Sequence, residues 1–272
     1  MGNQGDTMIR LVDGGPSAEP YAALSHCWGQ WGELNALKLL EENIDTLKEG
    51  FNLSEMPLAW QQAVLATREL GLNYLWIDSL CIKQRNRVDW EAESKKMGWY
   101  YSRASITIAA FDAPNGSYPI FNRRDPVTVK PCKLKIRVPR KGKTLTGYVH
   151  ASSFEPGISG AQRYNMAPLE QRAWCFQEMV LSPRVLKFGQ SQISFACHEY
   201  EASELRPEPL SRMDRYGMMQ RLLRQTAFRG NAFKSCEHAP GEKCDAHASA
   251  TNTFYHLVQD YSLLKLWARP YL

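Results

Sequence analysis

The chain has 272 residues, enough to bury a sizeable core in one large domain or two small ones. Its 44% hydrophobic and 22% charged residues exclude a disordered chain. The net charge of +5 permits anionic ligands but is too small to argue for nucleic acid, and no apolar run reaches the roughly 18 residues that span a bilayer. We therefore expect neither nucleic acid nor a membrane as a partner.

The amino-terminal segment and the cysteines indicate the compartment. Residues 1–20 predict a loose lead-in without the apolar centre of a signal peptide. The seven cysteines are odd in number and scattered, and three of them lie in apolar runs, as buried free thiols do: Cys27, Cys81 and Cys175. We expect a cytoplasmic protein in which these three thiols are inert packing groups.

Three short apolar runs predict buried strands in the first half of the chain. Residues 21–27 form a strand that ends in a turn at Gly29, and residues 74–78 and 105–110 form two more. Helical patterns separate them: residues 35–48, a helix from Pro57 to a stop at Gly71, and a helix capped by Asp89 with Trp90, Met97 and Tyr101 along one stripe. Strands that alternate with helices predict parallel pairing.

Residues 111–170 interrupt this alternation and predict a β-rich insertion. The segment is rich in Pro, Gly, Lys and Arg, and residues 133–138 and 145–150 have the pattern of a hairpin. Its basic residues are typical of a solvated loop, with contact to a polyanion or an acidic partner as the alternative.

The alternation resumes after the insertion. Residues 172–181 predict a helix, and residues 184–188 and 191–197 predict strands. We expect one domain over residues 21–204, with residues 205–272 as a carboxyl-terminal extension packed on it and closed by a helix over residues 253–266. The extension holds a cluster of zinc-type residues, Cys236, His238, Cys244 and His247, but their spacings match no common zinc site, so we expect no metal.

Four segments together resemble the fungal HET (heterokaryon incompatibility) domain family. They are YAALSHCWG from Tyr21, YLWIDSLCIKQ from Tyr74, residues 97–104 with the strand after them, and RAWCFQE from Arg172. The resemblance covers residues 20–204 and implies a role in cell death after non-self recognition, with a receptor or sensor protein as a partner. It departs from the family after Gln84, where Arg85, Asn86 and Arg87 replace the usual acidic residues.

A more distant resemblance bears on mechanism. The run WCFQEMV, residues 174–180, resembles the helix of Toll/interleukin-receptor (TIR) domains that carries their NAD-cleaving glutamate. It implies an α/β fold of the TIR-like (flavodoxin-like) class, with a parallel sheet flanked by helices. It further implies that Glu178 is the catalytic residue of an NAD glycohydrolase, which needs NAD as substrate, no cofactor, and self-association on activation.

Topology places the other motifs beside this glutamate, because ligands of doubly wound sheets bind beyond the carboxyl ends of the strands. The expected NAD-binding residues are Ser25, Trp28, Gly29, Asp78, Ser79, Arg172 and Trp174. Of these, the two tryptophans are expected to stack on a ring, and Arg172 to hold a phosphate. Ser25 and Gly29 are expected to approach the ribose or pyrophosphate, and Asp78 to accept a hydrogen bond from a ribose hydroxyl.

Structural roles remain open for each of these residues. Glu178 could pair with Arg184 as an ordinary helix residue, and Asp78 could cap its loop by accepting backbone amides. The tryptophans could pack in the core, Arg172 could bind a carboxylate of the fold, and the serine and glycine could only shape a turn. In function, the alternative is a signalling and self-association module without catalysis, or a sensor that binds NAD without cleaving it.

Overall fold

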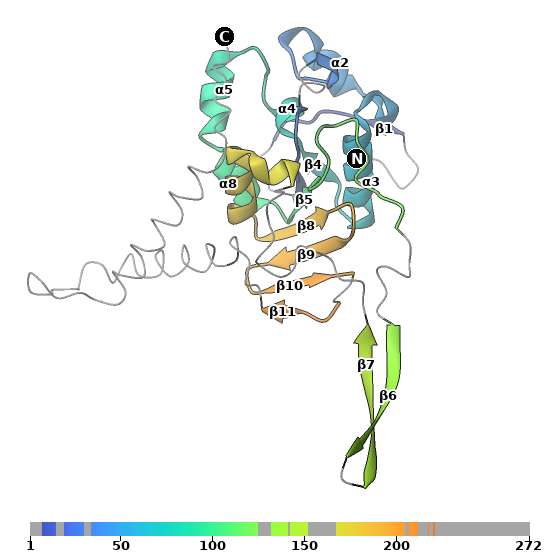
Figure 1. Ribbon diagram of the computed structural model, residues 1–272. Helices are drawn as coiled ribbons and strands as arrows, with labels where there is room; N and C mark the ends of the chain where they lie inside the picture. The colour runs from blue at the N-terminus through green and yellow to red at the C-terminus, as the bar shows by residue number, and fades with distance from the viewer. Residues whose placement is uncertain are drawn as a thin grey trace, which may run out of the picture.

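The structure is a computed structural model that describes residues 7–14, 19–29, 34–124, 132–140, 142–151, 167–204 and 207–211, together with Gly217 and Gln220. Within these residues the chain is a mixed α/β protein whose helices pack against a mixed sheet (Figure 1). The helix predicted over residues 253–266, the Cys/His cluster, and all of the extension beyond Gln220 lie outside the described residues.

A seven-stranded sheet forms the centre, in the order β11-β10-β9-β8-β5-β2-β4. Four strands are parallel, as predicted: β2 (Tyr21–Ser25), β4 (Tyr74–Trp76), β5 (Ile106–Ala109) and β8 (Arg184–Phe188). The other three extend the sheet as an antiparallel meander: β9 (Ile193–Cys197), β10 (Tyr200–Ser203) and β11 (Leu210–Ser211). The sheet is therefore mixed rather than parallel throughout.

One face of the sheet is covered by α3 (Leu58–Glu69). This helix follows Pro57 and stops before Gly71, whose φ of +72° only glycine adopts easily, so the predicted start and stop signals are both correct. Trp60 and Val64 of the helix belong to the same buried cluster as Leu24 of β2. Because side chains alternate along a strand, the residues on either side of Leu24 in β2 point to the opposite face of the sheet.

The opposite face is covered by α6 (Met97–Arg103) and α8 (Ala173–Leu181). Tyr101 of α6 packs with Ala23 of β2, and Met179 of α8 packs with Ala109 of β5. The two helices therefore lie over β2 and β5, the two strands at the middle of the parallel part of the sheet.

Two helix predictions were wrong in their extent. The helix expected over residues 35–48 is shorter: η1 (Glu41–Asn43) leads into α2 (Ile44–Glu49). The helix expected from Asp89 is divided into α5 (Arg87–Ser94) and α6, and follows the short α4 (Asp78–Cys81). Its cap is Asn86, whose side chain accepts the Asp89 N–H, while the Asp89 carboxylate accepts the Lys83 N–H.

Part of the amino-terminal segment that we expected to be loose is ordered. Its strand β1 (Met8–Ile9) pairs antiparallel with β3 (Phe51–Asn52), which leads into η2 (Leu53–Glu55). Ile9 is buried in the main core because the pairing holds it against the α2–α3 region.

The insertion contains the predicted hairpin. Strands β6 (Cys132–Arg140) and β7 (Lys143–Ala151) pair along their whole length, and the hairpin projects away from the sheet and helices (Figure 1). The insertion ends in η3 (Pro168–Gln171), immediately before α8. None of the helices in the described ranges is both long and apolar enough to cross a membrane.

Candidate functional site

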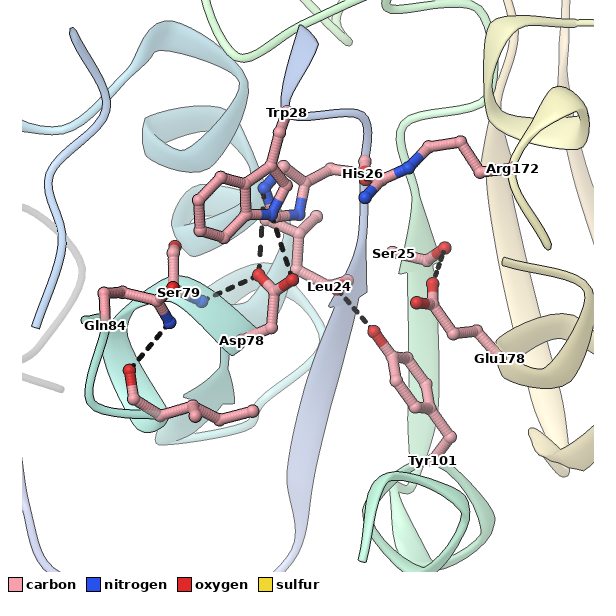
Figure 2. A network of polar contacts seen from close by, with 11 residues as sticks. Leu24, Ser25, His26, Trp28, Asp78, Ser79, Gln84, Tyr101, Arg172 and Glu178 are labelled. Carbon is pink, nitrogen blue, oxygen red and sulfur yellow. Dashed lines mark hydrogen bonds and ion pairs between the residues drawn. The ribbon is translucent and has the colours of Figure 1, made fainter. Parts of the chain in front are cut away.

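The candidate site lies where the carboxyl ends of β2 and β4 meet the start of α8. Ser25 is the last residue of β2, Asp78 follows β4, and Arg172 immediately precedes α8. Parallel strands end at the same edge of a sheet, so these polar residues, distant in sequence, come together as expected (Figure 2).

Glu178 is buried on the sheet-facing side of α8 and is bonded to the serine motif. It lies one turn after Cys175, which packs against the sheet, so helical spacing turns the carboxylate inward. The Ser25 hydroxyl donates to Glu178 Oε2 at 2.5 Å. Arg184, the alternative partner, is exposed and donates to the Ser105 carbonyl instead. The glutamate is therefore joined to β2 rather than to an arginine on β8.

The surroundings of Glu178 favour its protonated form. Burial raises its pKa to about 7, and the negative charge of Asp78 acts in the same direction. The Ser25 hydrogen bond, the positive charge of Arg172 and the Tyr101 hydroxyl oppose this effect. The carboxyl group consequently changes its charge near neutral pH.

Arg172 places a buried positive charge beside Glu178. Its Nη1 donates to the His26 carbonyl at 2.5 Å, which anchors the start of α8 to the end of β2. Burial lowers the pKa of this guanidinium, but the nearby acidic groups, Cys175 and Glu178 first, raise it by more. The side chain thus stays cationic and is held in place by the fold.

Tyr101 is a site residue that the sequence analysis named only as part of a helix stripe. Its hydroxyl donates to the Leu24 carbonyl at 3.0 Å, and the ring is fully buried against β2 beneath Glu178 (Figure 2). The same hydroxyl lies close enough to Glu178 to lower the pKa of its carboxyl group. The available signal was its position in the third family-like segment, residues 97–104.

Asp78 forms a second polar group on the other side of β2. Its Oδ2 accepts from Trp28 Nε1 at 3.0 Å, and its Oδ1 accepts from the Ser79 backbone N–H at 2.7 Å. Its side chain is 24% exposed, so part of the carboxylate reaches solvent. These contacts agree with the loop-capping role considered above.

His26 lies behind Asp78 and is neutral. Burial lowers its pKa to about 4, although Asp78 favours the charged form. Its Nε2 is 3.9 Å from Asp78 Oδ1, and its ring meets Trp60 edge-on. Cys27 instead belongs to the cluster of α8, so the two neighbours face opposite sides of the sheet and form no Cys–His pair.

Two of the expected ligand-binding residues have other positions. Trp174 is 46% exposed, whereas Cys175 beside it is buried, so the indole is turned away from the buried site. Gly29 has φ +60°, and a Cβ there would lie 2.9 Å from the Pro114 carbonyl oxygen. Its conformation and its close packing on the next loop account for glycine at this turn.

The site is closed in this structure. Ser25 is fully buried and Glu178 is 7% exposed, so a substrate can reach the carboxylate only if neighbouring groups move. The thiols around it are not nucleophiles, because burial raises the pKa of Cys27 to about 11 and that of Cys175 well above its ordinary value. Within the described ranges no group of His, Cys, Asp and Glu side chains could hold a metal.

Comparison with known proteins assigns the chain to a family. Residues 21–178, more than half of the chain, match the family described as heterokaryon incompatibility protein (HET). No curated protein and no solved structure matches the chain. The matched span begins at β2 and ends at Glu178, so it contains both polar groups of the site. The chain is therefore a member of the heterokaryon incompatibility (HET) family.

Proposed function

We propose that this domain is a cell-death effector of fungal non-self recognition, which acts by hydrolysing NAD at the nicotinamide–ribose bond, with Glu178 as the catalytic residue. The observation that carries the proposal is the contact between Ser25 and Glu178, which sets a carboxylate at the carboxyl end of the parallel part of the sheet. A carboxylate at this position, with the cationic Arg172 nearby, suits the cleavage of an anionic dinucleotide.

The strand order supports a TIR-like site. The four parallel strands lie in the order β4-β2-β5-β8, which in chain order is second, first, third, fourth. This is the flavodoxin-like order, in which ligands bind where the connections diverge between the first and third strands. Here that point lies between β2 and β5, the strands that α8 and Glu178 cover.

The chemistry needs one ionised carboxylate. Cleavage of the bond between ribose and nicotinamide passes through an oxocarbenium-like state, which a carboxylate stabilises by charge or by a transient ester. Nicotinamide leaves as a neutral molecule, so no strong general acid is required. Ser25 holds the carboxylate in position, and Arg172 supplies the positive charge that the phosphates of NAD require.

The burial of Glu178 implies that the resting chain is inactive. We propose that self-association, or contact with a receptor or sensor protein, displaces the start of α8 and exposes the carboxylate. The Arg172 guanidinium anchors that start to β2 through its bond to the His26 carbonyl, which a phosphate of NAD could replace. Activity is then expected to rise more steeply than protein concentration.

Release of nicotinamide from NAD, measured over a range of protein concentrations, tests the proposal. Glu178→Gln is expected to lower the rate at least a hundredfold, because the group that stabilises the cation is lost. Glu170→Gln is the matched control, since Glu170 is also buried but lies before α8 in η3. Undiminished cleavage by the Glu178 variant would remove this residue from the mechanism.

The burial of Glu178 also favours a second function, a signalling and self-association module without catalysis. In that case the Ser25–Glu178 bond only joins α8 to the sheet. Expression in fungal cells separates the two: toxicity that survives Glu178→Gln supports the module, and toxicity that is lost while the folded protein still accumulates supports the enzyme. Binding of NAD without release of nicotinamide, even in the assembled protein, would instead indicate a sensor.

A further inference from the structure

The β6–β7 hairpin is amphipathic. Residues alternate between the two faces of a strand, and the register pairs Leu134 with Val149 and Val138 with Leu145. One face therefore carries aliphatic side chains: Leu134, Ile136, Val138, Leu145 and Val149. The other face carries basic and polar side chains: Lys133, Lys135, Arg137, Thr144, Thr146 and Tyr148.

The apolar face is not covered by the described part of the chain. Its side chains are exposed by between 39% at Ile136 and 51% at Leu145. A lone two-stranded ribbon is only marginally stable in water, and a continuous apolar surface commonly marks a site of interaction. The hairpin projects away from the sheet and helices of the body (Figure 1). The apolar face of the hairpin is therefore suited to contact a surface outside the chain's own fold.

The positive charge of the hairpin indicates which kind of partner its apolar face contacts. Residues 132–151 contain six Lys and Arg and no Asp or Glu. Hairpins of two copies would repel one another, and a nucleic acid would engage the cations but leave the aliphatic face in water. A bilayer with anionic headgroups engages both, since aliphatic side chains enter the interface and cations meet the headgroups.

We propose that the β6–β7 hairpin docks the domain on an anionic lipid surface. The ribbon lies with its apolar face toward the acyl chains. The cations of the opposite face stay within about 10 Å of the headgroups, roughly one Debye length, and long side chains reach around the free edges of a two-stranded ribbon. Lys143, next to the turn, shares a face with Leu145 and contacts the headgroups directly. The sequence has no apolar run long enough to span a bilayer, and we therefore expected no membrane partner; this proposal revises that expectation.

Flotation of the full chain with vesicles tests this. Vesicles of phosphatidylcholine alone are compared with vesicles that also contain phosphatidylserine. The chain is expected to float with the anionic vesicles and to be released as salt rises. Lys135→Gln is expected to weaken binding about fivefold, which corresponds to about 1 kcal/mol per cation near such a surface. Val138→Thr with Leu145→Thr, which keeps a strand-forming residue at both positions, is expected to weaken it at least tenfold.

Exposed residues of the body supply the matched controls. Lys95→Gln and Val88→Thr change the same residue types outside the hairpin, and both are expected to bind as the unchanged chain does. Equal binding to neutral and anionic vesicles, insensitivity to salt, or no flotation at all would overturn the proposal. These comparisons use the unchanged chain, so they do not depend on whether a variant folds. Hairpin variants that change oligomer size or nucleic-acid binding while vesicle binding is unchanged would also overturn it, in favour of a second copy or a nucleic acid.

The lipid surface is independent of NAD cleavage. Glu178→Gln leaves the hairpin intact and is expected to float as the unchanged chain does. Failure of nicotinamide release with normal flotation therefore counts against the enzyme alone, and failure of flotation with normal release counts against the lipid surface alone.

Discussion

At the scale of single residues, the protonation of Glu178 links stability to function. The fold favours the neutral carboxyl, because its pKa is about 7 in the folded chain against an ordinary value of 4.5. A raised pKa contributes stability that is complete below about pH 4.5 and is lost as pH rises through about 7, on the order of 3 kcal/mol in all. The ionised form that the proposed chemistry needs is thus the less stable one.

We predict that Glu178→Gln stabilises the chain at alkaline pH. Glutamine has the shape of the protonated side chain and does not ionise, so the variant escapes the loss that the unchanged chain undergoes as pH rises from about 4.5 through about 7. Urea unfolding at about pH 5 and about pH 8 checks this. The midpoint of the unchanged chain should fall between the two conditions and that of the variant should not; parallel behaviour would contradict the raised pKa.

A second prediction concerns the pH profile of nicotinamide release. The rate at limiting NAD, which reports the pKa of the closed, unliganded chain, is expected to rise with pH through about 7 as Glu178 ionises. Ser25→Ala removes a hydrogen bond that lowers the pKa of Glu178, so the midpoint of the profile should move upward by about one pH unit. Thr67→Ala, which removes another buried hydroxyl, in α3 on the other face of the sheet, is the control and should leave the midpoint unchanged. A Ser25→Ala profile that coincides with the original would refute the coupling.

At the scale of elements, the turn after β2 joins the serine motif to the loop after β5. Gly29 has φ +60°, and a Cβ there would approach the Pro114 oxygen to 2.9 Å and the Asn115 Cβ to 3.0 Å. Gly71, at the end of α3, has a similar φ of +72° with nothing within 4 Å of a Cβ. The two glycines therefore separate the effect of backbone conformation from that of close packing.

We predict that Gly29→Ala destabilises the chain more than Gly71→Ala. The left-handed conformation costs both variants about 1 kcal/mol, and the contact with the next loop adds roughly 1–3 kcal/mol to the first alone. Urea midpoints measure both changes. Equal losses would mean that the loop of residues 114–115 yields without cost.

At the scale of the whole molecule, the hairpin is separable from the folded body. Cys132 pairs with Ala151, so its two ends lie side by side and a short Gly-Ser linker can replace residues 132–151. We predict that this replacement leaves the melting temperature of the remainder within about 2 °C, because the described hairpin contributes no buried side chain to the core. Thermal unfolding followed by circular dichroism checks this, and a large drop would show that the hairpin stabilises the body.

Local patterns in the sequence determined much of this protein. The apolar runs of β2, β4, β5 and β8, the start and stop of α3, and the hairpin within the insertion were all recognisable, because each depends on the period and propensity of neighbouring residues. The placement of Ser25, Asp78 and Glu178 near one sheet edge followed from a single topological rule.

Only the tertiary structure decided how these parts combine. It set the strand order, turned Ser25 toward Glu178 and Asp78 toward Trp28, and brought in Tyr101 from a helix named only for its stripe. It also divided the predicted helix into α5 and α6 and buried the carboxylate of Glu178. Such features depend on contacts between segments far apart in the chain, whose free energy no local pattern records.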